Sequence, residues 1–206
     1  MNFKKTFAAV AATAALAFAS GSASATVLNS ILHVDDSFIA YISTSDTEAG
    51  TAFSSGDVWS EGVPGQVTLD SGTDYYLHIF ARNASAMAGV LGEFELTDST
   101  HTFINGAQRL LTNSWDWVGN NTGFDGNYVE LSDFGYNGID PWYYREDTST
   151  DAQWVWAGYN EWTEVAYLST QILALDVPSD VPEPASLALL GLGLAGLTAA
   201  SRRRKG

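Results

Sequence analysis

The sequence predicts an all-β ectodomain, an antiparallel β-sandwich over residues 26–177, between an N-terminal signal peptide and a C-terminal transmembrane helix. Two observations predict the sandwich. Apolar side chains recur with period two in several short stretches, and turns rich in Gly, Asn and Asp separate these stretches at short spacing. No stretch of this part has the 3.6-residue period of an amphipathic helix. Many short strands joined by short turns are typical of two packed antiparallel sheets.

The alternation defines the expected strands one by one. Leu77 and Ile79 point to one face of a strand over residues 73–82, and His78 points to the other. The same period predicts strands over residues 30–34, 37–43, 66–69, 89–96, 153–156 and 165–172. Residues 113–151 are less regular and rich in Gly, Asn and aromatic residues, which predicts long loops with embedded strand fragments at one end of the sandwich.

Residues 1–25 have the three parts of a cleaved secretory signal peptide. Lys4 and Lys5 precede a short apolar run, and small residues follow, ending at Ala23 and Ala25. We expect signal peptidase to cut after Ala25. A retained N-terminal anchor is the alternative, which the shortness of the apolar run disfavours.

The other end of the chain predicts a membrane span. Residues 185–201 carry no charge, and at 1.5 Å per residue they extend about 25 Å, near the lower limit for crossing a hydrocarbon core. The basic tail 202–206 follows at once, and its cap is Arg202, Arg203, Arg204 and Lys205. Because basic residues stay cytoplasmic, the ectodomain is expected on the opposite side of the membrane. Before cleavage, this helix is expected to anchor the ectodomain to the membrane.

A linker over residues 178–184 precedes this span. Its motif is Val181, Pro182, Glu183 and Pro184. The order of motif, Gly- and Leu-rich span and basic end resembles the PEP-CTERM sorting signal of Gram-negative bacteria. The resemblance implies recognition by an exosortase, removal of the helix, and delivery from an inner-membrane-anchored precursor with a periplasmic ectodomain to the outer surface or the extracellular matrix. The alternative is that the two prolines simply end the chain's regular structure before a membrane helix.

Charge limits the possible partners of the ectodomain. Residues 26–180 include three basic and 23 acidic residues, a formal charge of −20. Such a surface cannot supply the cations that bind a phosphate backbone, which excludes nucleic acid as an expected partner. The chain has no Cys, so an exported domain without disulfides must rely on burial of its apolar and aromatic side chains.

A series of motifs follows a definite order along the ectodomain. They occupy residues 35–41, 59, 72–80, 88–91, 112–115, 138–142 and 152–156. Their order resembles a galactose-binding-like jelly roll of the kind found beside rhamnosidase-type glycoside hydrolases. The chain departs from that pattern after Tyr41, where residues 42–44 replace an Asn-Gly turn. The resemblance implies a jelly-roll-like sandwich and supports no activity by itself.

Aromatic residues suggest a ligand. Six of the seven tryptophans lie between residues 115 and 162, and an exposed ring can stack on the C–H face of a sugar while polar neighbours bind its hydroxyls. Candidate glycan contacts in loop-like sequence are Trp117, Trp142, Tyr143 and Tyr144. For Trp115, Trp154 and Trp156 we favour the core, because strands need inward aromatic residues. Replacing Trp117 and Trp142 by Ala is then expected to abolish polysaccharide retention without unfolding.

The acidic ectodomain also suggests a calcium ion, which takes several oxygen ligands. Residues 121–126 imitate an EF-hand loop only in part, because Gly123 occupies the third position and Ser132 the twelfth, so an EF-hand is excluded. A structural calcium ion in irregular loops stays a hypothesis, with candidate ligands Asp35, Asp36, Asp70 and Asp74. No other cofactor is indicated.

No motif indicates a catalytic residue. The chain has no Gly-x-Ser-x-Gly elbow, phosphate-binding loop or dinucleotide fingerprint, and its three histidines lack the spacing of metal ligands. The first hypothesis is therefore a non-catalytic surface or matrix protein that binds exopolysaccharide. The second is a structural or adhesive matrix protein that binds other proteins and has no glycan site. An enzyme is less consistent with the sequence, because close carboxylates such as Glu161 and Glu164 arise by chance in so acidic a chain.

Overall fold

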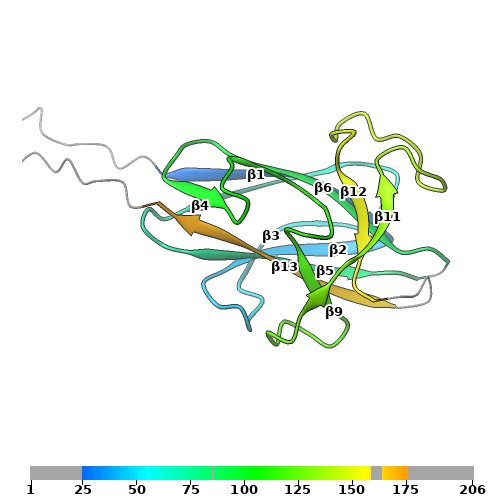
Figure 1. Cartoon of the computed structure of the whole chain (residues 1–206), viewed down its shortest axis with the longest axis horizontal. Coiled ribbons are helices and arrows are strands. Elements are labelled where there is room, and N and C mark those ends of the chain that lie inside the picture. The colour runs from blue at the N-terminus through cyan, green and yellow to red at the C-terminus, as the bar shows by residue number, and fades with distance from the viewer. Residues whose placement is uncertain (1–24, 85, 159–163, 176–206) are drawn as a thin grey trace, which may run out of the picture. The chain divides into compact units, whose positions relative to one another are not determined.

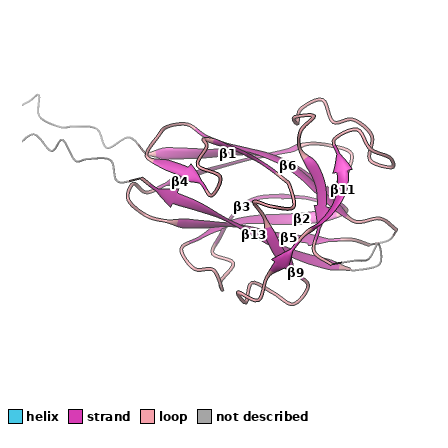
Figure 2. Ribbon diagram, in the orientation of Figure 1, coloured by secondary structure: helices cyan, strands magenta, loops and turns pink. Residues whose placement is uncertain are grey.

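Strands and loops make up the whole of the described chain, in which no residue is helical (Figure 2). The computed structural model describes residues 25–84, 86–158 and 164–175. Thirteen strands of this part pair antiparallel in two sheets. The expected all-β sandwich is thereby confirmed.

The first sheet has the strand order β11-β12-β6-β1-β4, with β8 paired to β6. Its strands are β1 (Thr26–Asp35), β4 (Val63–Leu69), β6 (Gly89–Leu96), β8 (Arg109–Leu111), β11 (Ser132–Tyr136) and β12 (Gln153–Trp156). The second sheet has the order β10-β9-β13-β5-β2-β3, with β7 paired to β13. Its strands are β2 (Ser37–Ser43), β3 (Thr51–Gly56), β5 (Tyr75–Arg82), β7 (His101–Phe103), β9 (Val118–Asn120), β10 (Val129–Glu130) and β13 (Val165–Ala174). Figure 1 shows β1, β4 and β6 in one layer over β2, β5 and β13 in the other.

All seven strands expected from the alternation are present. β2, β6 and β12 have the expected bounds, while β1, β4 and β13 are longer than predicted. The strands that the sequence did not predict are short, or lie at a sheet edge with Ser- and Gly-rich sequence, as β3 does. A two- or three-residue strand such as β9 or β10 is too short to show a period.

The main core lies between the two sheets. On β5, Leu77, Ile79 and Ala81 are fully buried there, as the period predicts. His78 points to the outer face but is buried as well, because the ring of Phe124 lies 4.5 Å from its ring, centre to centre. A surface loop therefore covers part of the outer face of the second sheet.

A second, smaller apolar cluster covers the outer face of the first sheet. Leu91 of β6 belongs to it, together with Trp142 and Trp154, whose stacked rings have centres 4.6 Å apart. Gly89 makes room for this stack, because a Cβ there would lie 2.8 Å from Trp154 and 2.9 Å from Trp142. The loop that carries Trp142 is thus packed onto the sheet.

The first and last strands of the described part meet at one end of the sandwich. Oγ1 of Thr26 lies 3.0 Å from Nδ1 of His101, and His101 pairs with Ala174 at the end of β13. Within the described residues, no helix has the length and apolar character needed to cross a membrane. Apart from Ala25, the predicted signal peptide, sorting motif, span and basic cap lie outside these residues.

Candidate functional site

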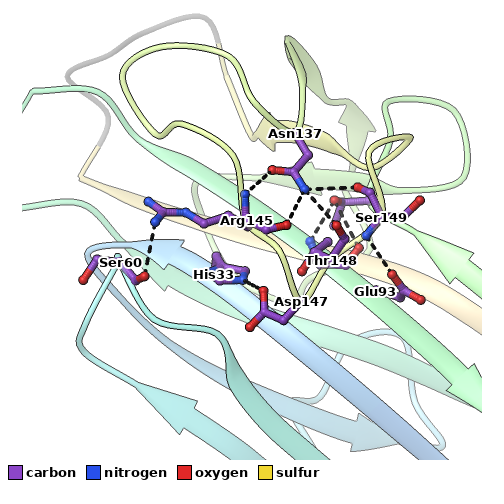
Figure 3. A network of polar contacts seen from close by, with 10 residues as sticks. His33, Ser60, Glu93, Asn137, Arg145, Asp147, Thr148 and Ser149 are labelled. Carbon is purple, nitrogen blue, oxygen red and sulfur yellow. Dashed lines mark hydrogen bonds and ion pairs between the residues drawn. The ribbon is translucent and has the colours of Figure 1, made fainter.

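One amide side chain organises residues 137–149, which we call the Asn137 loop. Nδ2 of Asn137 donates to the carbonyl oxygens of Arg145 and Thr148, both at 2.8 Å, and to that of Ser149 at 3.3 Å (Figure 3). Its Oδ1 accepts the backbone N–H of Arg145 at 2.8 Å. Asn137 is itself buried, so these bonds form away from bulk water and fix the shape of the loop.

A hollow of about 410 Å³ lies beside this loop, and we call it the Tyr144 hollow. Its lining consists of His33, Ser60, Glu61, Gly62, Tyr144, Arg145, Glu146 and Asp147. Tyr144 is 52% exposed, and its neighbour Tyr143 is 64% exposed. The hollow therefore combines an accessible ring with hydroxyl and carboxylate groups, a set that can hold a sugar by stacking and by hydrogen bonds.

Arg145 joins the Asn137 loop to the segment before β4. Its guanidinium carbon lies 5.0 Å from the ring centre of Trp59, and its Nη1 donates to the carbonyl oxygen of Ser60 at 3.2 Å. Nε and Nη2 of Arg145 are buried and have no hydrogen-bond partner within the described residues, so the stack on Trp59 carries much of the contact. A second accessible ring, 38% exposed, is thereby held next to the Tyr144 hollow.

A buried histidine borders the same hollow. Nε2 of His33 lies 2.7 Å from Oδ1 of Asp147 (Figure 3). Burial lowers the pKa of His33, against the raising effect of the Asp147 carboxylate, so at neutral pH a neutral imidazole donates its Nε2–H to that carboxylate. A Cβ at Gly62 would overlap the Asp147 carboxylate, so a larger residue there would displace Asp147 from His33.

Tyr143 has a left-handed backbone conformation, with φ of 58°. Its N–H donates to the carbonyl oxygen of Ile139 at 3.0 Å, which closes one tight turn of the loop. A residue with a Cβ is uncommon at such a φ, and Gly or Asn would adopt it with less strain. A large exposed ring at a strained position favours a role in binding over a role in stability.

Two of the four predicted glycan contacts are wrong. Trp117 is completely buried, with 0% exposure, and packs on Phe94 with ring centres 5.2 Å apart. Trp142 is 1% exposed. Their indole N–H groups donate inside the fold, to the carbonyl oxygen of Leu111 at 3.1 Å and to Oδ2 of Asp35 at 2.9 Å. Neither ring can stack on a sugar.

The expectation for Trp115 is wrong in the opposite sense, because this ring is 68% exposed rather than in the core. Trp154 and Trp156 are fully buried, as expected. Neither Asn137 nor Arg145 was among the site residues predicted from the sequence. A signal for Arg145 was present, since it is one of three basic residues in the ectodomain.

The hydrogen bond from Trp142 ties this loop to Asp35 at the end of β1. Burial raises the pKa of Asp35 to about 6, the Trp142 N–H opposes this, and the neighbouring Asp36 carboxylate adds to it. The ordinary value is 3.8, so the folded state binds this proton more tightly than the unfolded state does. The stability contributed by neutral Asp35 is therefore complete below about pH 4 and is lost as the pH rises through about 6.

Asp35→Asn is expected to remove this pH dependence. The amide stays neutral at every pH, and its oxygen can still accept the Trp142 N–H. Because Asp35 is partly exposed, solvent screening reduces the effect. In urea denaturation we expect equal free energies of unfolding for variant and wild type near pH 4, and an advantage of about 1 kcal/mol for the variant near pH 7.5. The same difference at both pH values would contradict this account.

The four carboxylates considered for calcium do not form one site. The pair Asp35 and Asp36 lies at the end of β1. The pair Asp70 and Asp74 flanks the turn between β4 and β5, beside the start of β1. The ten residues of β1 separate the two pairs by about 30 Å. Among the residues that the structure describes, no group of three or more His, Asp or Glu side chains is arranged to hold a metal ion.

The C-terminal tail matches a known family of sequence motifs. Residues 180–205 match the family model of the PEP-CTERM protein-sorting motif. This PEP-CTERM match supports an exported protein of a Gram-negative bacterium, sorted by an exosortase from a membrane-anchored precursor. It includes the predicted motif at residues 181–184 and the basic cap, all outside the described residues. No curated protein and no solved structure matches the chain, so the galactose-binding-like resemblance stays a prediction.

Proposed function

We propose that the ectodomain is a non-catalytic carbohydrate-binding module, and that the exported protein holds an exopolysaccharide at the outer surface or in the extracellular matrix. The observation that carries this proposal is the Tyr144 hollow, where exposed rings and polar groups meet on a loop of fixed shape. Export, which the PEP-CTERM match supports, would allow the ectodomain to meet such a ligand outside the cell.

Two properties of the Tyr144 hollow support a sugar. Tyr144 in the lining, and Trp59 beside it, offer accessible rings for C–H faces, while Glu61 and Glu146 offer carboxylate oxygens for hydroxyl donors. The bonds of Asn137 hold the loop in place before any ligand arrives, which reduces the entropy lost on binding.

The test is affinity electrophoresis of the full-length chain, in nonionic detergent, through gels that contain different bacterial exopolysaccharides. We expect at least one polysaccharide to retard wild type, and Trp59→Ala with Tyr144→Ala to weaken the apparent affinity at least about tenfold, as truncation of aromatic anchors does. Tyr136→Ala removes an exposed ring from β11 and is the matched control, which should bind as wild type.

Retardation that survives in the double variant would assign the binding to another surface. Absence of retardation by every polysaccharide, with the fold verified by circular dichroism, would contradict the proposal and favour a structural or adhesive protein of the matrix.

A further inference from the structure

A second hollow, of about 230 Å³, lies on the outer face of the second sheet, and we call it the Trp115 hollow. Its lining consists of Asp46, Tyr76, Ile104, Trp115, Asp116, Val118, Tyr128, Ser169, Thr170 and Gln171. None of these residues lines the Tyr144 hollow, which lies beside the first sheet. Whatever binds here does so independently of the function proposed above.

The indole of Trp115 is exposed, while the backbone that carries it is held by hydrogen bonds. Oδ1 of Asn113 accepts the backbone N–H of Trp115 at 3.0 Å and that of Asp116 at 2.6 Å. The hydroxyl of Thr170 on β13 donates to the carbonyl oxygen of Asp116 at 2.8 Å, which fastens this turn to the sheet. Ile104 and Val118 beside it are also exposed, so an apolar surface is kept open to solvent on a rigid support. Such a surface is typical of a preformed contact for a ligand.

The charge of the Trp115 hollow favours a cation. Asp46 and Asp116 supply carboxylates, and none of the residues that line the hollow is Lys, Arg or His. Oδ2 of Asp116 accepts the Asn113 amide at 2.8 Å, which fixes the position of that carboxylate. Residues 26–180 carry a formal charge of −20, which attracts cationic ligands and repels anionic ones over several ångströms. Trp is also the side chain that best binds a cation over its ring face.

The remaining lining suits a sugar. Tyr76, Tyr128 and Ser169 carry hydroxyls. The Gln171 amide donates to the Tyr76 hydroxyl at 3.3 Å, and the Tyr128 hydroxyl donates to the carbonyl oxygen of Asp46 at 2.8 Å, which leaves its oxygen as an acceptor. These groups can exchange hydrogen bonds with several hydroxyls of one ligand, and a flat indole fits the C–H face of a pyranose ring. A lysine side chain would satisfy the carboxylates but has no hydroxyl groups to exchange hydrogen bonds with this lining.

We propose that the Trp115 hollow binds an amine-bearing sugar, a protonated hexosamine unit of a polysaccharide. The sugar ring stacks on Trp115, and its ammonium group lies between the carboxylates of Asp46 and Asp116. The hydroxyls of the lining bind the hydroxyls of the sugar. The positive charge of the amine, and not the sugar ring alone, determines which polysaccharide is bound.

The test is calorimetric titration of the full-length chain, in nonionic detergent near pH 6, with glucosamine oligomers and with N-acetylglucosamine oligomers of equal length. We expect the amine form to bind at least about tenfold more tightly, and its binding to weaken at least about fivefold when NaCl rises from about 50 to about 500 mM. Trp115→Ala should lose at least about tenfold in affinity, and Asp46→Asn should lose affinity and part of the salt dependence. Tyr144→Ala is the matched control and should bind the amine form as wild type does.

Several results would overturn the proposal. Equal affinities for the two oligomers would show that the positive charge of the amine does not contribute to binding. Tight binding of oligolysine with the same dependence on Trp115 would show that the sugar is not required. Absence of binding, or unchanged binding by Trp115→Ala, would reject the hollow itself. Because Trp115 is largely exposed, its variant should keep the wild-type circular dichroism spectrum, and an altered spectrum would contradict the exposure on which the proposal depends.

Discussion

Trp142→Ala is expected to lower the free energy of unfolding by about 4 kcal/mol, as removal of a buried Trp side chain does. The ring stacks on Trp154, fills the cluster over Leu91, and holds Asp35 through its N–H. Without it, the outer face of the first sheet loses its cover and Asp35 loses its donor. Urea denaturation followed by circular dichroism measures the loss, and the midpoint of thermal unfolding should fall by roughly 10 °C.

Trp115→Ala is the matched control for this loss, since it deletes the same ring from an exposed position. Its free energy of unfolding should stay within about 1 kcal/mol of wild type. Equal losses in the two variants would contradict the burial of Trp142. Because Trp117 and Trp142 are both buried, a variant of either residue that no longer retains polysaccharide would do so because it is destabilised, and not because a stacking contact with the sugar is lost.

Asn137→Ala is expected to cost about 3 kcal/mol of stability and to abolish binding at the Tyr144 hollow. The substitution removes four side-chain hydrogen bonds to the backbone of Arg145, Thr148 and Ser149, and a net contribution of about 1 kcal/mol for each bond with some overlap gives this magnitude. Hydrogen exchange should show faster exchange for amides of residues 143–149.

Asn137→Asp separates the hydrogen bonds from the volume of the side chain. A carboxylate keeps the acceptor for the Arg145 N–H but faces three carbonyl oxygens with no donor, so this variant should be as unstable as Asn137→Ala near pH 7 and should regain stability in acid. Asn29→Ala, which removes one exposed side-chain bond to Gln66, should change stability by less than about 0.5 kcal/mol. An unchanged exchange rate in the Asn137 loop would refute its organising role.

The strands that the sequence predicted are those whose alternation extends over four or more residues. β5 and β6 bury one face between the sheets, so the core imposes a period that the sequence must carry. β9 and β10 show no such period, because each has only two or three residues. Their positions are set by pairing with each other and with β13, which lies far away in the sequence. The sorting motif was predictable for another reason, since an enzyme recognises it as a short linear sequence.

The candidate site was predicted only in part. Tyr143 and Tyr144 are exposed as expected, but the loop-like sequence around Trp142 gave no sign that this loop packs onto a sheet. Trp115 was assigned to the core, but it lies in the loop between β8 and β9, where an Asx turn at Asn113 directs it outward. The exposure of a ring depends on which distant residues cover it. Leu91 and Trp154 cover Trp142, and the local composition around Trp142 does not encode this contact.

The antiparallel ladder between β13 and β5 has a mechanical consequence. Eight consecutive residue pairs join these two strands, from Val165 to Ile172, and β13 leads directly toward the tail. His33, beside the Tyr144 hollow, lies about 23 Å along β1 from the end where β13 finishes. Tension applied between the Tyr144 hollow and the end of β13 would load this ladder along its strands, so that many hydrogen bonds share the force in shear. A last strand loaded in this way resists separation better than one that is peeled away one bond at a time.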